Sequence, residues 1–258
     1  MEKIKVLVSG CNGHMGKLVC RLIGESDDMC VLYGFDIKSS ISDFPFFNNV
    51  TDLANAKTLP DIIIDFSSPK CTLDLLENYA GKHHIPMVIG TTGFSDDEVE
   101  IIKSYAKKFP IFLASNMSYS VALLEELLRE LAPKLSGYDI EIVETHHNRK
   151  KDAPSGTAKT LANAMAEALS DAGNDMSVVY GRSGKRELNE IGISALRGGN
   201  IVGTHTINFY GQSDTLSITH TALSREMFAE GAVKAARFVI NQIAKGCIFA
   251  LFTMKDLM

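Results

Sequence analysis

The segment of residues 144–157 carries the side chains of this sequence that are best suited to chemistry. His146 and His147 are adjacent, and an imidazole gives or takes protons near neutral pH. Lys150 follows in the same segment and adds a positive charge. Proton donors beside cations suit a reaction on an anionic substrate. A solvated basic loop before an ordinary helix is the simpler interpretation of the same residues.

The end of this segment predicts a binding site for an anion. Ser155 follows Pro154 and stands just before a helical pattern at 158–169. Serine is a favoured N-cap, and the amide groups at the start of a helix bind carboxylates and phosphates. We therefore expect Ser155, Gly156 and Thr157 to hold an acidic group of a ligand.

A glycine-rich loop near the N-terminus predicts a dinucleotide site. The loop has the pattern GxxGxxG and lies between an apolar strand at 4–8 and a helix at 17–23. Glycines in this place let the backbone approach a pyrophosphate, whose charge the helix N-terminus stabilises. A tight turn without a ligand is the alternative. The expected cofactor contacts are Gly10, Cys11, Asn12, Gly13, His14, Met15 and Gly16.

Asp36 follows the second predicted strand, at 30–35, and stands twenty residues after Gly16. A carboxylate in this position accepts hydrogen bonds from the adenine ribose hydroxyls and repels a 2′-phosphate. No arginine follows it, and Lys38 only softens the repulsion, so we expect NADH to be used at least as well as NADPH. The alternative role for Asp36 is to cap a turn.

Strands and helices alternate through the first part of the chain. Further short apolar strands are predicted at 62–66, 86–89 and 111–114, with helices at 70–82 and 96–108. This alternation is typical of an α/β fold of the Rossmann type, a doubly wound parallel sheet with helices on both faces. The loops after its strands meet at the carboxyl edge, where a cofactor binds. Two of these loops contain Gly90, Thr91 and Thr92, and Ala114, Ser115, Asn116 and Met117.

A different pattern begins after residue 116. It predicts a helix at 121–135, then strands at 139–144, 177–180, 191–196, 201–210 and 215–221, and a last helix at 228–245. We expect a second domain of the α+β class with a largely open, mixed sheet. Apolar positions within 191–209 look exposed, so an edge and a face of that sheet need cover.

Composition and charge exclude several other classes. The 258 residues include 26 Lys and Arg against 31 Asp and Glu, and the net charge of −5 disfavours broad binding to nucleic acid or an anionic membrane. The apolar runs at 4–10 and 247–252 are too short for a signal peptide or a membrane span. We therefore expect a cytoplasmic enzyme.

Cysteines and histidines predict neither a disulfide framework nor a metal centre. The five cysteines are an odd number and form no CxxC pair. Cys71 stands at a helix start, but the sequence offers it no partner base. His146 and His147 are adjacent, so their side chains point apart, and no carboxylate or thiol stands at metal spacing. We expect no metal.

Taken together, these motifs resemble the 4-hydroxy-tetrahydrodipicolinate reductase family, whose older name is dihydrodipicolinate reductase. The resemblance runs from end to end and rests on residues 10–16, 65–69, 90–93, 144–157, 220–225 and 228–232. It implies reduction of 4-hydroxy-tetrahydrodipicolinate to tetrahydrodipicolinate with NADH or NADPH, in the diaminopimelate route to lysine. A catalytically silent dinucleotide sensor with the same fold is the alternative, and an assay of cofactor oxidation separates the two.

The resemblance also assigns roles to individual residues. It implies that His146 is the acid/base residue and that Lys150 is a second catalytic proton donor. It places His147, Gly156 and Thr157 against the substrate, a small dicarboxylate. It adds the loops after the fourth and fifth strands to the cofactor site.

For the whole chain, the resemblance implies a dinucleotide domain of residues 1–116 plus 226–258, a substrate and oligomerisation domain of residues 117–225, and a homotetramer. Members of the family often carry a basic residue where His14 stands, and some carry arginine in place of Ile37. The C-terminal end is also looser than the usual form.

One other class of nicotinamide enzyme is excluded by the sequence. Short-chain dehydrogenases and sugar epimerases share a GxxGxxG loop, but they need the motif Tyr-x-x-x-Lys. None of the seven tyrosines has a lysine four residues further on.

Overall fold

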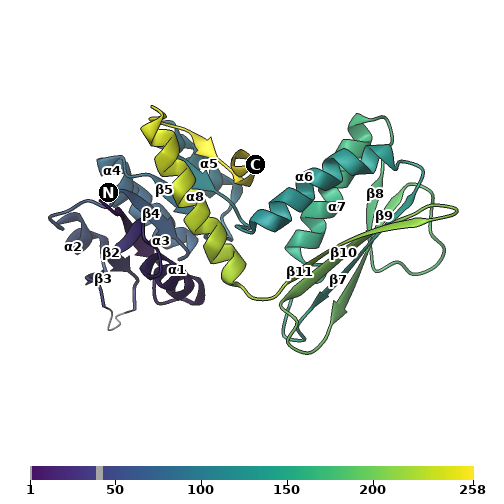
Figure 1. Ribbon diagram of the computed structural model, residues 1–258, viewed down its shortest axis with the longest axis horizontal. Coiled ribbons are helices and arrows are strands. Elements are labelled where there is room, and N and C mark those ends of the chain that lie inside the picture. The colour runs from purple at the N-terminus through teal and green to yellow at the C-terminus, as the bar shows by residue number, and fades with distance from the viewer. Residues whose placement is uncertain (1, 39–42) are drawn as a thin grey trace. The chain divides into compact units, whose positions relative to one another are not determined.

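The chain forms two compact units, each built on its own β-sheet. This computed structural model describes residues 2–38 and 43–258. Unit 1 comprises Met1–Tyr119 and Glu226–Met258, and unit 2 comprises Ser120–Arg225 (Figure 1). The chain therefore leaves unit 1, completes unit 2, and returns.

Unit 1 contains a seven-stranded parallel sheet in the order β12-β6-β5-β4-β1-β2-β3. The chain proceeds from β1 towards one edge and then from β4 towards the other, so the topological switch point lies between β1 and β4. The predicted doubly wound sheet is confirmed. Its strands are β1 (Ile4–Ser9), β2 (Met29–Phe35), β3 (Phe46–Phe47), β4 (Ile62–Asp65), β5 (Met87–Ile89), β6 (Ile111–Leu113) and β12 (Leu251–Phe252).

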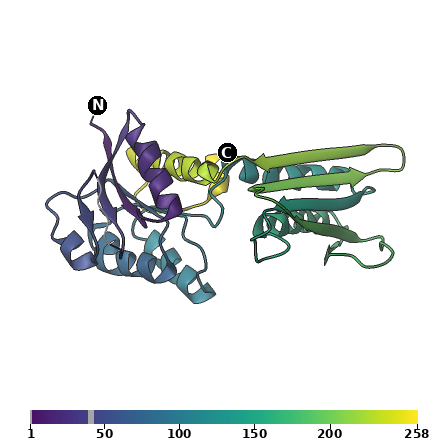
Figure 2. The ribbon, with the colours of Figure 1, turned by 90° about the horizontal axis from the view of Figure 1, so that it is seen from below.

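Helices cover both faces of this sheet (Figure 2). One face carries α1 (His14–Gly24) and α8 (Glu226–Ala244). The other carries α2 (Val50–Ala54), α3 (Pro69–Leu75), the π-turn η1 (Leu76–Ala80), α4 (Gly81–His83) and α5 (Asp96–Ala106). Strands covered on both faces must be apolar throughout, and Val6, Leu7 and Val8 are indeed all fully buried.

Four short elements of unit 1 were not predicted, namely β3, α2, β12 and the 3-10 helix η2 (Met254–Leu257). At the C-terminal end, β12 pairs with β6 and extends the sheet before η2. The ring of Phe252 packs edge-on against Phe238 of α8, with 5.1 Å between the ring centroids. The C-terminal end of the chain therefore adds an edge strand to the unit 1 sheet and packs against α8.

Unit 2 contains a five-stranded mixed sheet in the order β11-β10-β7-β9-β8. β7 is parallel to β9 and antiparallel to β10. Two helices, α6 (Tyr119–Lys134) and α7 (Gly156–Asp171), pack on the same face of this sheet (Figures 1 and 2). The strands are β7 (Asp139–His146), β8 (Ser177–Tyr180), β9 (Glu190–Arg197), β10 (Gly203–Tyr210) and β11 (Thr215–Ala222).

The apolar positions within 191–209 are of two kinds. Leu196 and Ile201 are 53 % and 41 % exposed, as expected from sequence, whereas four others are buried, contrary to that expectation. Ile191, Ile193, Ile207 and Phe209 are at most 2 % exposed and belong to the core beneath α6 and α7. They alternate along their strands with residues that face the other way, because successive strand residues point to opposite faces. The opposite face is polar, with side chains such as Glu141, Thr206, Ser217 and Thr219.

Candidate active site

Strand register in unit 2 gathers four titratable or charged side chains on the helix-covered face of the sheet. Glu144 of β7 pairs with His205 of β10, and His146 of β7 pairs with Arg197 of β9. Glu144 and His146 continue the alternation begun by the core residues Ile140 and Ile142. The same two-residue period that builds the core therefore places these polar groups inside.

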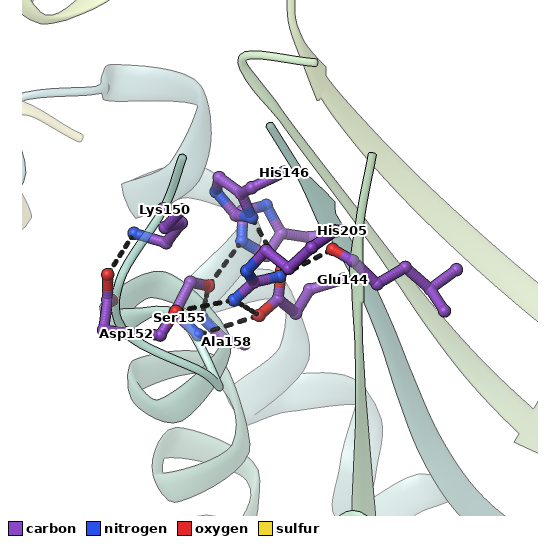
Figure 3. A network of polar contacts seen from close by, with 9 residues as sticks. Glu144, His146, Lys150, Asp152, Ser155, Ala158 and His205 are labelled. Atoms are coloured by element: carbon purple, nitrogen blue, oxygen red, sulfur yellow. Dashed lines mark hydrogen bonds and ion pairs between the residues drawn. The ribbon is translucent and has the colours of Figure 1, made fainter. Parts of the chain in front are cut away.

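The Glu144 carboxylate is fully buried and accepts four hydrogen bonds (Figure 3). Arg197 donates from Nη1 to Oε2 at 2.8 Å and from Nη2 to Oε1 at 2.7 Å. His146 Nδ1 lies 2.6 Å from Oε2, and the Ser155 amide donates to Oε1 at 2.9 Å. Burial alone would raise the pKa of Glu144, but these donors outweigh it and lower the pKa below its ordinary value.

The His146 ring has its two nitrogens in different surroundings. Nδ1 is taken up by Glu144, and the edge of the ring packs on His205, with 5.2 Å between the centroids. Nε2 lies over Gly203, where a Cβ atom would come within 2.9 Å of it. Glycine at the start of β10 therefore leaves the space that the imidazole occupies.

Lys150 belongs to the loop that connects β7 to α7. Its ammonium pairs with the Asp152 carboxylate at 2.9 Å, and the Asp152 carbonyl accepts a hydrogen bond from Arg197 Nη2 at 2.7 Å. Figure 3 shows Lys150, His146 and Ser155 grouped around the start of α7. The Arg197 guanidinium thus contacts both the buried Glu144 carboxylate and the loop that carries Lys150.

Ser155 is the N-cap of α7, as its sequence predicted, and its Oγ accepts a hydrogen bond from the Ala158 amide at 3.2 Å. Gly156 and Thr157 form the first turn of the helix. The first amide groups of a helix have no acceptor within the helix itself, so this end attracts anions. The predicted anion-binding residues therefore stand in the same unit as the histidines and the lysine.

His147 follows the end of β7 and is partly buried. Burial lowers the pKa of His147, and the nearby cations Arg149 and Arg225 act in the same direction. Its Nδ1 is buried and has no hydrogen-bond partner within residues 2–38 and 43–258. A neutral ring with an unsatisfied nitrogen suits contact with a polar ligand.

Three residues of this cluster received no role from sequence reasoning, namely Glu144, Arg197 and His205. His205 Nε2 lies 3.1 Å from Ser155 Oγ, so His205 also touches the start of α7. The signal that could have identified them is the alternation of each strand. Each of the three has the same parity as apolar core residues of its own strand, and a charged group at such a position needs a partner.

In unit 1, the glycine loop is shaped by close backbone contacts. Gly10 has a φ of +74°, and a Cβ atom there would lie 2.3 Å from the Phe66 carbonyl oxygen. A Cβ atom on Gly16 would lie 2.1 Å from the Gly10 carbonyl oxygen. The first and last glycines of the motif are therefore required by the turn itself.

A cavity of about 270 Å³ opens beside this loop at the carboxyl ends of β1 and β4. Four of the fifteen predicted cofactor residues line it, namely Gly10, Asn12, Gly13 and Asp36. The rest of the glycine loop and the residues at 90–92 and 114–117 do not. Burial raises the pKa of the Cys71 thiol, which also borders the cavity. The lining residues are Gly10, Asn12, Gly13, Asp36, Ile37, Lys38, Phe66, Ser67, Ser68 and Cys71.

The Asp36 carboxylate is held in the wall of this cavity by two backbone amides. Oδ2 accepts from the Asn12 amide and Oδ1 from the Lys38 amide, both at 3.1 Å. The contact with Lys38 is the turn cap that the alternative interpretation expected. Asp36 therefore caps a turn and also faces the cavity.

A second buried carboxylate ties together the loops at the carboxyl edge of the unit 1 sheet. Asp65 accepts hydrogen bonds from Ser67 Oγ at 2.6 Å, Thr72 Oγ1 at 2.5 Å and Thr91 Oγ1 at 2.7 Å. The Ser67 amide in turn donates to Thr91 Oγ1 at 2.8 Å. The loop containing Gly90, Thr91 and Thr92 is thereby fixed beside the loop that follows β4.

The loop after β6 packs against the returning helix α8. The Ala114 amide donates to the Ile89 carbonyl at 3.2 Å, and the Ser118 amide donates to Asn116 Oδ1 at 2.9 Å. A Cβ atom on Gly231 would lie 1.7 Å from the Met117 carbonyl oxygen. Residues 114–117, which include Ser115, are therefore positioned by the C-terminal part of the chain.

None of the helices in residues 2–38 and 43–258 combines the length and apolar character that crossing a bilayer requires. Over those same residues, no three or more His, Cys, Asp or Glu side chains gather in a way that could hold a metal ion.

Family models match both parts of the chain. Residues 4–117 match the family described as dihydrodipicolinate reductase, N-terminus. Residues 120–258 match the family described as dihydrodipicolinate reductase, C-terminus.

Relatives named 4-hydroxy-tetrahydrodipicolinate reductase are similar over nearly the full length. The protein of Caldanaerobacter subterraneus subsp. tengcongensis is 44% identical over 98% of this chain and 98% of its own. That of Clostridium novyi is 40% identical over 98% of this chain and 97% of its own. That of Sulfurimonas denitrificans is 42% identical over 93% of this chain and 95% of its own.

Solved structures share the fold. A dipicolinate-bound dihydrodipicolinate reductase from a Paenisporosarcina species has a TM-score of 0.75 at 24% identity, with 98% of each chain covered. An engineered D-amino acid dehydrogenase bound to NADP+ has a TM-score of 0.59 at 14% identity, with 100% of this chain and 96% of the other covered. The arrangement of strands and helices therefore recurs among dehydrogenases.

The surroundings of His205 predict how the stability of the protein depends on pH. His205 is 5 % exposed, and burial lowers its pKa from 6.5 to about 4, with His146 adding to the effect. In the unfolded chain the ring regains its ordinary pKa, so between these values the unfolded state binds the proton more readily. The stabilisation by neutral His205 is complete above about pH 6.5 and is lost as the pH falls towards about 4, by about 3 kcal/mol in all.

Urea unfolding at a series of pH values checks this expectation. The free energy of unfolding of His205→Gln is expected to fall less steeply between about pH 6.5 and about pH 4 than that of the wild type. The matched control is His83→Gln, since His83 is exposed on α4, and its slope should equal that of the wild type. An unchanged slope in His205→Gln would contradict the prediction.

Proposed function

This chain belongs to the dihydrodipicolinate reductase family, and we propose that it catalyses the reaction for which its relatives are named. That reaction is the reduction of 4-hydroxy-tetrahydrodipicolinate to tetrahydrodipicolinate with a nicotinamide dinucleotide, in the diaminopimelate route to lysine. The protein is an oxidoreductase. The observation that carries the proposal is the cluster of His146, Glu144 and Lys150 at the start of α7.

In this proposal, the residues of unit 2 supply the proton. A bound nicotinamide would supply a hydride to an electron-poor carbon of the substrate ring, a neighbouring ring atom would gain a proton, and the 4-hydroxyl group of the starting compound would leave as water. His146 Nε2 is the donor, because Nδ1 is taken up by Glu144. Lys150 serves as the second proton donor and as a counter-charge. Proton transfer by a positioned group typically contributes ~10²–10⁴-fold to a rate.

The substrate carries two carboxylates, and the start of α7 is suited to hold one of them. The helix begins with Gly156 and Thr157 behind the Ser155 cap, where a negative charge is stabilised, while the Ser155 amide itself already donates to Glu144. His147 offers its unsatisfied Nδ1 as a further polar contact. These four residues are the proposed substrate-binding set.

Unit 1 is proposed to hold the dinucleotide. The cavity beside the glycine loop, with the N-terminus of α1 at the end of that loop, fits the pyrophosphate of such a cofactor. In terms of domains, residues 1–116 plus 226–258 bind the cofactor, and residues 117–225 bind substrate and assemble the oligomer. The proposed cofactor contacts are Gly10, Cys11, Asn12, Gly13, His14, Met15, Gly16, Asp36, Gly90, Thr91, Thr92, Ala114, Ser115, Asn116 and Met117.

We further propose that the enzyme is a homotetramer assembled through the uncovered face of the unit 2 sheet. Both helices of this unit pack on one face, and the other face carries a hydrogen-bonded pair of threonine hydroxyls, Thr206 and Thr219, 3.1 Å apart. Light scattering at micromolar concentration should give the mass of four chains. The mass of a single chain would contradict the assembly while leaving the reaction untouched.

Replacing His146 tests the assignment of the proton donor. His146→Gln is expected to lower kcat by ~10²–10⁴-fold, because glutamine cannot supply the proton. Lys150→Ala should be at least as damaging, since it removes a proton donor and a charge. Cofactor affinity, measured by nicotinamide fluorescence, should stay unchanged in both variants, and the control His83→Gln should match the wild type.

The outcome that would contradict the assignment is a His146→Gln enzyme with a kcat within about twofold of the wild type. A wild-type protein that binds the dinucleotide but oxidises none with this substrate would instead favour the silent sensor.

The second functional prediction is that NADH is used at least as well as NADPH. The Asp36 carboxylate faces the cavity, where it can accept hydrogen bonds from ribose hydroxyls and would repel a 2′-phosphate. A difference of ~1.4 kcal/mol is tenfold in affinity, so even a partly screened charge should affect the preference. The measurement is kcat/KM with each cofactor for the wild type and Asp36→Ala.

Asp36→Ala should shift the ratio of kcat/KM values towards NADPH by about tenfold. The control Asp27→Ala removes an exposed carboxylate at the opposite edge of the sheet, just before β2, and should leave the ratio unchanged. A wild type that prefers NADPH tenfold, or a ratio that Asp36→Ala does not move, would leave Asp36 with its turn-capping role alone.

A further inference from the structure

We infer that Glu144 and Arg197 are positioning residues for the proton donor, an inference that rests on the proposed function. Glu144 fixes which nitrogen of His146 exchanges the proton, and Arg197 holds Glu144 ionised and correctly oriented. Neither residue needs to touch the substrate for this role.

The contacts of His146 Nδ1 determine which nitrogen of the ring carries the hydrogen. Nδ1 lies 2.6 Å from Glu144 Oε2, so one of the two atoms must donate. Arg197 and the Ser155 amide also donate to this carboxylate and lower the pKa of Glu144, so it is ionised and can only accept. Nδ1 therefore carries a hydrogen, and Nε2 is left to gain and release the proton.

The orientation of the His146 ring is fixed by its neighbours. The contact with Glu144 and the space above Gly203 define where the imidazole lies, since a Cβ atom on Gly203 would come within 2.9 Å of Nε2. His205 packs on the ring edge, and burial lowers its pKa to about 4, so it stays neutral and does not compete for the proton near neutral pH. The ring is therefore held by groups from two strands, Glu144 of β7 and Gly203 and His205 of β10.

Arg197 links the two proposed proton donors, His146 and Lys150. It binds both oxygens of Glu144 and also donates to the Asp152 carbonyl at 2.7 Å. The Asp152 carboxylate pairs with Lys150 at 2.9 Å. A continuous series of contacts thus runs from His146 through Glu144, Arg197 and Asp152 to Lys150. A guanidinium can bind both oxygens of a carboxylate through two parallel hydrogen bonds, and an ammonium cannot.

A purely structural role for the pair is the competing explanation, because a buried carboxylate and a guanidinium also join β7 to β9. Two variants separate these roles. Glu144→Gln leaves Arg197 without its anion and should lower thermal stability. The double variant Glu144→Gln/Arg197→Gln removes both charges, so it should recover much of that stability.

If the pair positions His146, stability and turnover will separate. We expect kcat to fall by about 10²-fold or more in both the single and the double variant, with little change in the KM for substrate. The control Asp28→Asn removes the carboxylate of another bidentate pair, with Arg237 of unit 1, and should keep the wild-type kcat. Recovery of kcat together with stability in the double variant would overturn the inference.

A second measurement needs no substrate and so does not depend on the proposed reaction. Nitrogen-15 NMR of histidine-labelled wild-type protein should show that the singly protonated form of His146 carries its hydrogen on Nδ1. In the double variant the signals of both ring nitrogens should move, because glutamine can donate as well as accept. A wild-type ring with its hydrogen on Nε2 would overturn the inference. An inactive wild type with the expected tautomer would count against the reaction and not against the positioning.

Discussion

The buried carboxylate of Glu144 is the constraint on which unit 2 depends. Withdrawing an ionised group from water costs several kcal/mol, and the cost is offset only when its oxygens are fully hydrogen-bonded. Here the donors come from three places, namely the guanidinium of Arg197 on β9, the imidazole of His146 on β7 and the amide of Ser155 before α7. Satisfying one side chain therefore fixes two strands and the start of a helix relative to one another.

The two-residue period of β7 is what makes this arrangement possible. Ile140 and Ile142 point into the core beneath the helices, and Glu144 and His146 point the same way two and four residues later. A slip of one residue in the pairing would move all four side chains to the opposite face. The apolar residues therefore set the register, and the register brings Glu144 and His146 to their partners on β9 and β10.

Sequence reasoning succeeded where the signal is local. The strand, glycine turn and helix at 4–24, the N-cap at Ser155 and the parallel sheet all follow from neighbouring residues, and the structure contains them. Sequence reasoning failed where the pairing of distant strands decides which residues meet. Arg197 lies 53 residues from Glu144, and the apolar positions at 191–209 could not be assigned to a face until the strand order was known. The two-residue strands β3 and β12 are too short to show any period.

Each unit buries one carboxylate close to its proposed ligand site, and the donors around each carboxylate distinguish the two roles. Asp65 is satisfied by the hydroxyls of Ser67, Thr72 and Thr91, which are neutral donors from three successive segments of the chain. Such a network of hydroxyl donors organises loops. Glu144 is satisfied instead by a guanidinium and an imidazole, and the imidazole can change its charge as a reaction proceeds. The chemistry of the donors thus favours a structural role for Asp65 in shaping the cofactor loops, and a role for Glu144 in the transfer of a proton.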